Sequence, residues 1–343
     1  MLNIISRSII IGGVSGPQKV VGNLIRGLDI LGYPYCINKD LGATSQLWIQ
    51  DDITALKEAS KRKLKAIVGP NLYVFPRNIP ENIDMSNFVY ISPSKQIIDL
   101  WKYLGFNRCP QDFWPTGIDT MEFPERKKPK NGIVLIYFKE RYAEELDFVK
   151  KRLTENQIKY KIIIYGKYNE KNYRCLLEKT KYIIWIGKGE SQGIALQEAL
   201  SMNVPVLVWD VEKIGHWVPP TKKEKNMLNE KELNYKFVTS AYYFDDRCGI
   251  KAKNKNEIEA FISDMEKRWE GFEPRKYIIE NLSLEKQARE LIELFNKHHG
   301  ISYENGKREF LKTNKKWKNN KLYFKAFIYA KLRTKNFIKS FKK

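Results

Sequence analysis

The sequence predicts an α/β protein built from two doubly wound parallel sheets, one after the other along the chain. Short apolar runs alternate with amphipathic helical patterns over most of the length, which is typical of parallel sheets covered by helices. A turn-rich segment at 114–130 interrupts the alternation once, and the alternation then restarts. The length of 343 residues fits this division, since one domain commonly takes about 100–200 residues.

The first half is expected to open with a strand, a glycine-rich turn and a helix. The apolar run at 8–11 predicts the strand, and Gly12 and Gly13 predict the turn. Pro17 suits the first turn of the helix, which the apolar spacing carries to Gly32. The other elements expected in this half are strands at 45–49, 64–68 and 88–91 and helices at 53–62 and 96–104.

The second half repeats the pattern after the segment at 114–130, which we interpret as the linker between domains. Its expected strands lie at 132–137, 160–165, 182–186 and 204–209. Its expected helices lie at 143–156, 170–179, 193–202, 255–269 and 283–297. Two such halves predict a ligand site in the cleft between them.

The composition limits the classes of partner and cofactor. A net charge of +21 raises three partners: nucleic acid, an anionic membrane surface and a phosphate-bearing substrate. No stretch approaches the roughly 18 consecutive apolar residues of a membrane span, and the N-terminus reads as a strand rather than a signal peptide, so we expect a cytoplasmic protein. The scattered cysteines and few histidines predict reduced thiols, with neither a disulfide framework nor a metal site.

The segment 186–208 carries the most specific chemical pattern. It reads as strand, glycine loop, helix and strand, with Glu190 in the loop and Glu198 in the helix. A helix N-terminus offers unpaired N–H groups and a positive dipole end to a phosphate, and Gly193 allows close approach of the backbone. A carboxylate in the helix can accept hydrogen bonds from ribose hydroxyls, while one in the loop can reach a group beyond the phosphates. The layout suits a nucleoside diphosphate with a polar substituent.

This pattern resembles the retaining GT-B glycosyltransferases of family four, the glycosyl transferases group one. Glu190 and Glu198 are eight positions apart and are followed by alanine and by Asn-Val-Pro-Val at 203–206, as in that family's signature. The turn-rich Trp-Pro-Thr-Gly-Ile-Asp-Thr-Met-Glu-Phe at 114–123 resembles the family's linker. The resemblance covers about residues 8–298. It implies the GT-B fold, in which two Rossmann-like domains face each other across a cleft.

The resemblance also implies a domain order. Residues 1–118 would form a Rossmann-like domain on the acceptor side, and residues 119–282 a Rossmann-like domain that binds the nucleotide sugar. A closing helix would follow at 283–300, and the basic aromatic tail at 301–343.

Roles for individual residues follow from the same resemblance. Glu190 would hold hydroxyls of the donor sugar, and Glu198 would hold the ribose. Lys139 and Arg141 follow the first strand of the second half and would neutralise the leaving diphosphate, so they are expected to be catalytic together with Glu190. The backbone of Ser191, Gln192, Gly193 and Ile194 would hold the diphosphate, and the other residues expected to bind the donor are Gly166, Gly12 and Gly13.

The implied reaction moves a sugar from a nucleotide-diphosphate sugar to a hydroxyl of a glycan, lipid or other acceptor, with retention of anomeric configuration. No metal or other cofactor is expected. Fixed cations and helix N–H groups would stabilise negative charge on the leaving diphosphate, whose oxygen would take the acceptor's proton. The family commonly has a histidine of the first domain near the sugar. This sequence has none before His216, so that interaction is absent or replaced.

Two other classes of function stay open at this stage. The pattern Gly187-x-Gly189-x3-Gly193, with Asp210 at the end of the next strand, forms a loose dinucleotide fingerprint and would indicate an NAD-dependent Rossmann enzyme. That hypothesis leaves Glu190, Glu198 and the linker motif unexplained. The other class is a non-catalytic basic protein that binds membrane or nucleic acid.

The tail at 301–343 holds more than half of the net charge. It contains 14 Lys or Arg and 2 Glu, interleaved with aromatic residues at helical spacing. This pattern predicts an amphipathic helix on an anionic membrane surface, which would make the protein peripheral to a membrane. The alternative is a helix that packs on the enzyme body or on a partner subunit. No base-reading module is recognisable, so nucleic acid is not an expected partner.

Overall fold

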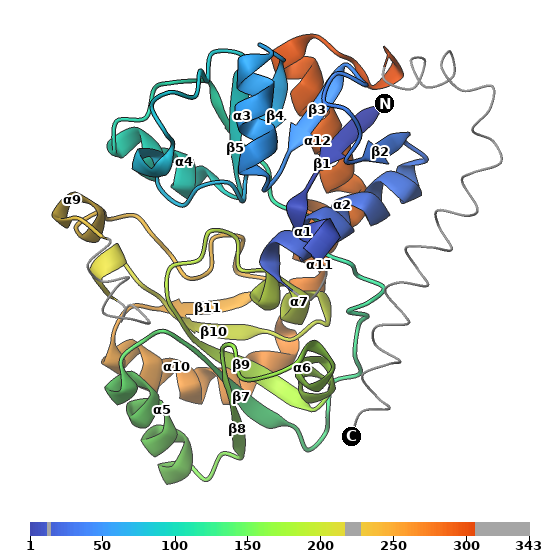
Figure 1. Cartoon of the computed structure of the whole chain (residues 1–343). Coiled ribbons are helices and arrows are strands. Elements are labelled where there is room, and N and C mark those ends of the chain that lie inside the picture. The colour runs from blue at the N-terminus through green and yellow to red at the C-terminus, as the bar shows by residue number, and fades with distance from the viewer. Residues whose placement is uncertain (12–14, 217–227, 306–343) are drawn as a thin grey trace.

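The computed structural model describes residues 1–11, 15–216 and 228–305. Two α/β halves lie one above the other (Figure 1). The first holds a six-stranded sheet of order β2-β1-β3-β4-β5-β6, and the second a five-stranded sheet of order β11-β10-β9-β7-β8. The pairings recorded between these strands are parallel. The predicted fold class, with two Rossmann-like domains, is confirmed.

The first half follows the predicted alternation after its opening element. Its strands are β1 (Leu2–Ile5), β2 (Tyr35–Ile37), β3 (Gln46–Ile49), β4 (Ala66–Val68), β5 (Phe88–Ser92) and β6 (Gln111–Phe113). Its helices are α1 (Arg7–Ile11), α2 (Gly16–Leu31), α3 (Ile53–Lys61) and α4 (Lys95–Tyr103), with a 3-10 turn η1 (Pro76–Asn78). Helices α3 and α4 pack on one face of the sheet, and α2 packs on the other.

The prediction for the opening strand was wrong. The buried first strand is β1, whereas the run at 8–11 lies in helix α1, where Ile10 and Ile11 are 70% and 67% exposed. The Asp51 carboxylate accepts hydrogen bonds from the backbone N–H groups of Arg7 and Ser8, and so supports a helix directly after the strand. Short apolar runs do not distinguish strand from helix by periodicity. Gly12 and Gly13 lie outside the described residues.

The elements predicted for the second half are present to within a few residues, and the half also contains elements that were not predicted. Its strands are β7 (Ile133–Lys139), β8 (Tyr160–Ile164), β9 (Thr180–Gly187), β10 (Val206–Trp209) and β11 (Gly249–Ala252). Its helices are α5 (Ala143–Glu155), α6 (Glu170–Leu177), α7 (Ile194–Ser201), α9 (Glu230–Leu233), α10 (Lys255–Arg268) and α11 (Pro274–Leu282), with 3-10 turns η2 (Ile214–His216) and η3 (Trp269–Gly271). Of these strands and helices, β11, α9 and α11 were not predicted. Helices α5 and α10 cover one face of the sheet, and α6, α7 and α11 cover the other.

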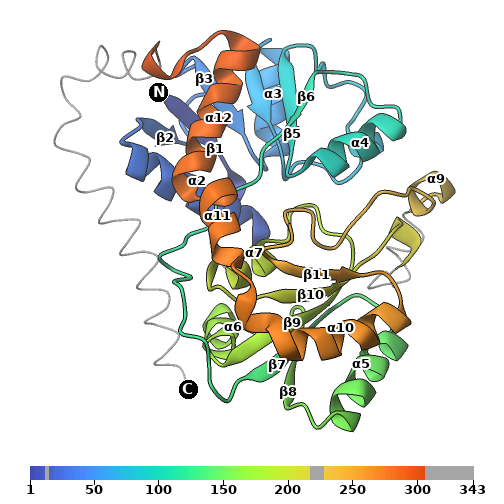
Figure 2. The same ribbon diagram turned by 180° about the vertical axis from the view of Figure 1, so that it is seen from behind.

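The chain passes between the halves at two adjacent places. Ile118 in the linker donates its N–H to the carbonyl of Leu282 at the end of α11, at 2.7 Å. The last described helix, α12 (Leu284–His299), then crosses back and packs beside α2 of the first half (Figure 2). Its residues Leu291 and Phe295 are fully buried there. The helix expected to close the fold is therefore part of the core of the first half.

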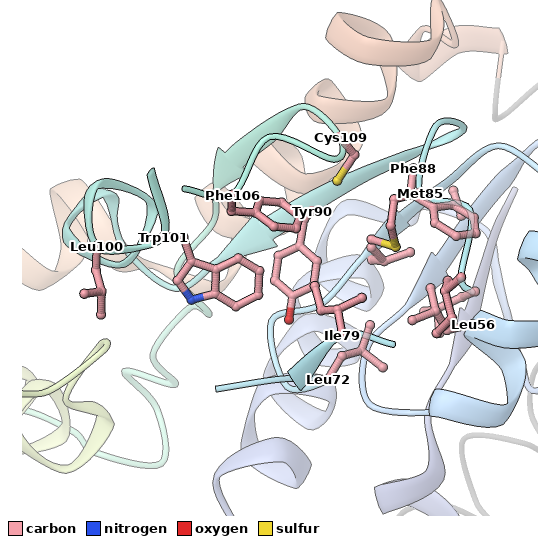
Figure 3. Close-up of a cluster of buried hydrophobic side chains, with 14 of the residues drawn as sticks. Leu56, Leu72, Ile79, Met85, Phe88, Tyr90, Leu100, Trp101, Phe106 and Cys109 are labelled. Atoms are coloured by element: carbon pink, nitrogen blue, oxygen red, sulfur yellow. The ribbon is translucent and has the colours of Figure 1, made fainter. Parts of the chain in front are cut away.

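A segment of the second half also packs into the first half. We call residues 211–216 and 228–238 the docking arm. Its apolar side chains, Val211, Ile214, Tyr235 and Val238, belong to the cluster that contains Tyr90, Trp101 and Phe106, which Figure 3 displays. Arg77 of the first half forms a two-pronged ion pair with Glu232 of the arm, at 2.7 and 2.9 Å. The relative placement of the halves thus depends on more than the linker.

The structure also bears on the expected state of the cysteines and on the expected lack of a membrane span. The four cysteines, all in the described part of the chain, form no disulfide bond; Cys36, Cys109 and Cys248 are buried, and Cys175 is exposed. Within residues 1–11, 15–216 and 228–305, none of the helices has the length and apolar character needed to cross a lipid bilayer.

Candidate active site

The carboxyl ends of the second sheet's strands face the first half. Strand β7 ends at Lys139 and β9 at Gly187, and the loop 188–193 then leads into α7. Helices α2 and α4 of the first half supply hydrogen bonds to this region. In doubly wound sheets, ligands bind outside the carboxyl ends of the strands.

Glu190 in this loop is paired with a cation of its own half. Lys139 Nζ lies 2.5 Å from Glu190 Oε1, and both side chains are nearly buried. The ammonium also lies 4.2 Å from the centre of the Tyr165 ring. Burial lowers the pKa of Lys139 and the Glu190 carboxylate raises it, with a net rise. Lys139 is therefore a fixed positive charge at the carboxyl ends of β7 and β9.

Glu198 is paired with a cation of the opposite half. It lies on α7 and is 4% exposed, and its carboxylate accepts a hydrogen bond from Lys19 of α2. The same ammonium lies 2.5 Å from Glu170 Oε1. Burial raises the pKa of Glu198 to about 7, although Lys19 acts in the opposite direction. Lys19 was not predicted from the sequence, because it belongs to no recognisable motif. The one available signal was its position shortly after the glycine turn, at the start of a helix expected to border the cleft.

Helix α7 begins directly after a glycine in the left-handed conformation. Gly193 has a φ of +83°, a left-handed conformation that favours glycine, and precedes the first residue of the helix, Ile194. The first N–H groups of a helix have no partner within the helix. Ser191 is exposed and Ile194 is half-buried. Gly166 has a φ of +78°, and no other atom lies within 4 Å of the position its Cβ would occupy.

Gln192 joins the loop to the linker. Its side-chain oxygen accepts from the N–H of Thr116 at 3.0 Å, and its amide nitrogen donates to the Thr116 carbonyl at 2.8 Å. The same nitrogen donates to Gln197 Oε1 at 3.0 Å. This buried side chain holds the loop in place, and its polar atoms are occupied within the protein.

No hydrogen bond or ion pair joins Arg141 to Glu190 or Glu198 among the described residues. Its buried guanidinium donates to the carbonyls of Gly187 and Trp209, at 3.0 and 2.9 Å, and to the carboxylate of Glu145 at 2.9 Å. These bonds tie the ends of β9 and β10 to the segment after β7. Of the two cations expected from the sequence, Lys139 alone is paired with Glu190, and Lys19 takes the corresponding position beside Glu198.

Asp210, the acid of the dinucleotide hypothesis, is bonded within the protein. Its carboxylate accepts from Thr239 Oγ1 at 2.6 and 2.8 Å and from the N–H and hydroxyl of Ser240 at 2.7 and 3.0 Å. An acid with that role would have to present its carboxylate to a ribose. No group of His, Cys, Asp or Glu side chains that could hold a metal ion occurs among the residues whose placement the structure describes.

Comparisons with known proteins bear on the fold. No family model matches the chain, and no curated protein does. Among solved structures, the chain is similar to sucrose-phosphate synthase from Thermosynechococcus elongatus, with a TM-score of 0.55 and 9% identity over 88% of this chain and 99% of that one. It is also similar to the catalytic domain of starch synthase IV from Arabidopsis thaliana bound to ADP and acarbose, with a TM-score of 0.51 and 9% identity over 87% and 99%. At such identities the likeness shows the fold alone, which is GT-B.

Proposed function

We propose that this chain is a retaining glycosyltransferase of the family-four type. It would transfer a sugar from a nucleotide-diphosphate sugar to a hydroxyl of a glycan or lipid acceptor. The observation that carries this proposal is the convergence of Glu190, Glu198 and the N-terminus of α7 at the carboxyl ends of the strands, opposite the first half. Two cations, Lys139 and Lys19, accompany the glutamates.

The donor would bind along α7. The diphosphate would lie against the first N–H groups of the helix, where Gly193 lets the backbone approach closely. Glu198 would accept hydrogen bonds from the ribose hydroxyls, and Lys19 would shift from the carboxylate to make room. Glu190 would accept hydrogen bonds from the hydroxyls of the sugar. Gly166 would give the nucleoside room at the end of β8.

Cleavage of the sugar–phosphate bond places negative charge on the leaving diphosphate. Lys139 and the helix N-terminus are fixed donors near that charge, so they would stabilise the transition state without reorganising. The departing phosphate oxygen would take the acceptor's proton, which requires no base from the protein. We omit Arg141 from this step because its guanidinium is bonded to Glu145 and to two backbone carbonyls.

The tail would bring the enzyme to an anionic membrane surface. Tyr303, near the start of the tail, packs on Tyr33 with ring centres 4.9 Å apart, while residues 306–343 lie outside the described part of the chain. Deletion of 306–343 should weaken binding to vesicles containing phosphatidylglycerol and leave nucleotide binding unchanged. Equal binding of the two proteins to these vesicles would overturn the membrane proposal.

A screen of nucleotide sugars tests the enzyme class. The full-length protein is incubated with UDP-, GDP- and ADP-sugars, and release of the nucleoside diphosphate is measured. Hydrolysis of one donor, with thermal stabilisation by the matching nucleoside diphosphate, is the expected result. Stabilisation by NAD(P)H alone would overturn the assignment. Once an acceptor is identified, NMR of the product gives its anomeric configuration and so tests whether the reaction proceeds with retention.

A further inference from the structure

Gln96 links the first half to the loop that carries Glu190. It is the second residue of α4, and its side chain is almost fully buried. Its amide nitrogen donates to the backbone carbonyl of Glu190, and its amide oxygen accepts from the N–H of Thr239 at 3.2 Å. Gln96 lies in the first half, and both of its partners lie in the second.

The three residues form a closed arrangement of hydrogen bonds. The N–H of Glu190 donates to the carbonyl of Thr239 at 3.1 Å, so Gln96 spans two backbone segments that are already bonded to each other. One end of its amide must donate and the other must accept. A side chain that has the same length but lacks the amide satisfies neither backbone group.

Thr239 is itself held firmly from the second half. Its hydroxyl donates to Asp210 and accepts from Lys251 Nζ at 3.1 Å. The next residue, Ser240, donates its N–H to the same Asp210 carboxylate at 2.7 Å. The loop at 188–193 has no regular secondary structure, so its position depends on such individual bonds. Thr239 thus holds the N–H of Glu190 from within the second half. Gln96 holds the carbonyl of Glu190 from the first half.

We propose that Gln96 is a positioning residue that couples the seating of α4 on the second half to the placement of the Glu190 carboxylate. This inference rests on the proposed function, in which Glu190 holds the donor sugar. When α4 is seated, the carbonyl of Glu190 is satisfied and its side chain is directed at Lys139. When α4 withdraws, the carbonyl loses its partner and the loop gains freedom. Sugar transfer would therefore proceed only from the seated arrangement.

This role predicts separate effects on chemistry and on nucleotide binding. No hydrogen bond joins Gln96 to Glu198 or to the first turn of α7 within the described part of the chain, so it should not affect the affinity for a nucleoside diphosphate. A displacement of about 1 Å at a reacting group can cost roughly 10²-fold in rate. If the side chain served only to pack the two halves together, its replacement would lower stability. It would not lower the rate of sugar transfer while leaving the affinity for the nucleoside diphosphate unchanged.

The test compares Gln96→Met with Tyr243→Phe in the full-length protein. Methionine is close in length to glutamine but cannot make either bond. Tyr243→Phe removes another hydrogen bond between the halves, from the Tyr243 hydroxyl to the Pro93 carbonyl at 2.7 Å, and does not touch the Glu190 loop. The measurements are donor hydrolysis at saturating nucleotide sugar, the Kd of the matching nucleoside diphosphate, and amide hydrogen exchange of residues 187–193. Circular dichroism checks that each variant is folded.

For Gln96→Met we expect hydrolysis to fall about 10- to 100-fold, with the Kd changed less than about twofold, and faster exchange over 187–193. Tyr243→Phe should match the wild type in all three. Equal exchange and equal rates in the two variants would overturn the inference. If the wild type hydrolyses no nucleotide sugar while Gln96→Met still exchanges faster over 187–193, the positioning of Glu190 is supported and the proposed function fails.

Discussion

The two carboxylates of the site are held in opposite ways. The charge of Glu190 is balanced by Lys139 from its own half, while its backbone is bonded to Gln96 of the other half. The backbone of Glu198 lies within α7, while its charge is balanced by Lys19 from the other half. Contact between the halves therefore determines the position of the Glu190 backbone. At Glu198 the same kind of contact supplies the cation that balances the carboxylate.

Under the proposed function, this difference predicts separate roles for the two ends of the site, one in catalysis and one in binding of the donor. The Glu190 end has its positive charge in place whether or not the first half is seated, as a group that stabilises a transition state requires. The Glu198 end must exchange its cation for the ligand, as a binding contact can. Substitutions at the Glu190 end should therefore change turnover, and those at the Glu198 end should change affinity.

The largest effect is expected for Glu190→Ala. Loss of the carboxylate removes the contact proposed for the donor sugar, so turnover should fall about 10³-fold or more while the nucleoside diphosphate still binds. Donor hydrolysis and calorimetric titration with the diphosphate measure the two quantities, and circular dichroism checks the fold. Wild-type turnover in this variant would remove Glu190 from the catalytic group and would leave the two carboxylates without distinct roles.

The next effect is expected for Lys139→Met. Removal of one fixed donor to a developing negative charge typically costs roughly 10²–10³-fold in kcat. Lys188→Met is the matched control, because Lys188 lies in the same loop but pairs with Glu140. Single-turnover rates of both variants show whether the loss is specific to Lys139. Equal losses in the two would indicate that general positive charge, and not Lys139, supports the reaction.

Arg141→Gln tests whether every cation at the Glu190 end is catalytic. Its guanidinium is buried against Glu145 and the ends of β9 and β10, so its loss should leave buried acceptors without donors. We expect the free energy of unfolding to fall by about 2–3 kcal/mol, with turnover per folded molecule little changed. Urea unfolding measures the first quantity. Unchanged stability with lost turnover would return Arg141 to the catalytic group.

Glu198→Ala tests the binding role proposed for the other end of the site. The expected loss is about tenfold in donor affinity, with a smaller change in kcat, because the hydrogen bonds proposed for the ribose are equal in the ground and transition states. Glu170→Gln is the control, since Glu170 contacts the same Lys19. Calorimetry gives the Kd of each variant. A pure loss of kcat in Glu198→Ala would contradict a binding role.

The smallest expected effect is the dependence of stability on pH. The pKa of Glu198 is raised to about 7, so the folded state favours its protonated form. That stabilisation is complete below the ordinary carboxyl range and is lost as the pH rises through about 7. Relative to wild type, Glu198→Gln should therefore gain stability from about pH 5 to about pH 8, by on the order of 1–2 kcal/mol. Urea unfolding at both pH values tests this, and a constant difference would refute it.

The elements predicted well are those with strong local patterns. The helix at 193–202 and the strands beside it were expected from apolar spacing and Gly193, and α7, β9 and β10 occupy those places. The strands β2, β6 and β11 and the helices α9 and α11 were not predicted. Equally short strands such as β4 and β10 are marked by runs of apolar residues, whereas β6 and β11 each contain a charged residue, Asp112 and Lys251. The run at 8–11 predicts a strand but forms α1, because a short apolar run does not distinguish the two by periodicity.

Side-chain roles were harder to predict than elements. The family resemblance implies that Arg141 neutralises the leaving diphosphate, and the structure shows that its guanidinium bonds the carbonyls of Gly187 and Trp209. The family resemblance implies that the backbone of Gln192 helps to hold the diphosphate, and the structure adds that its side chain bonds Thr116 of the linker. Position along the chain indicates which end of a sheet a residue occupies, but not whether its side chain points to the ligand or into the protein.

Local sequence patterns were sufficient to predict the α/β class, the two halves, and the loop and helix that present Glu190 and Glu198. These features depend on local patterns of apolar residues and glycine. Only the tertiary structure supplied Lys19 and Gln96, which lie 179 and 94 positions from the residues they bond. Such contacts depend on how two separately patterned halves pack together, through α12 and the docking arm. No local pattern near Lys19 or Gln96 encodes that packing, so only the folded chain brings them to the site.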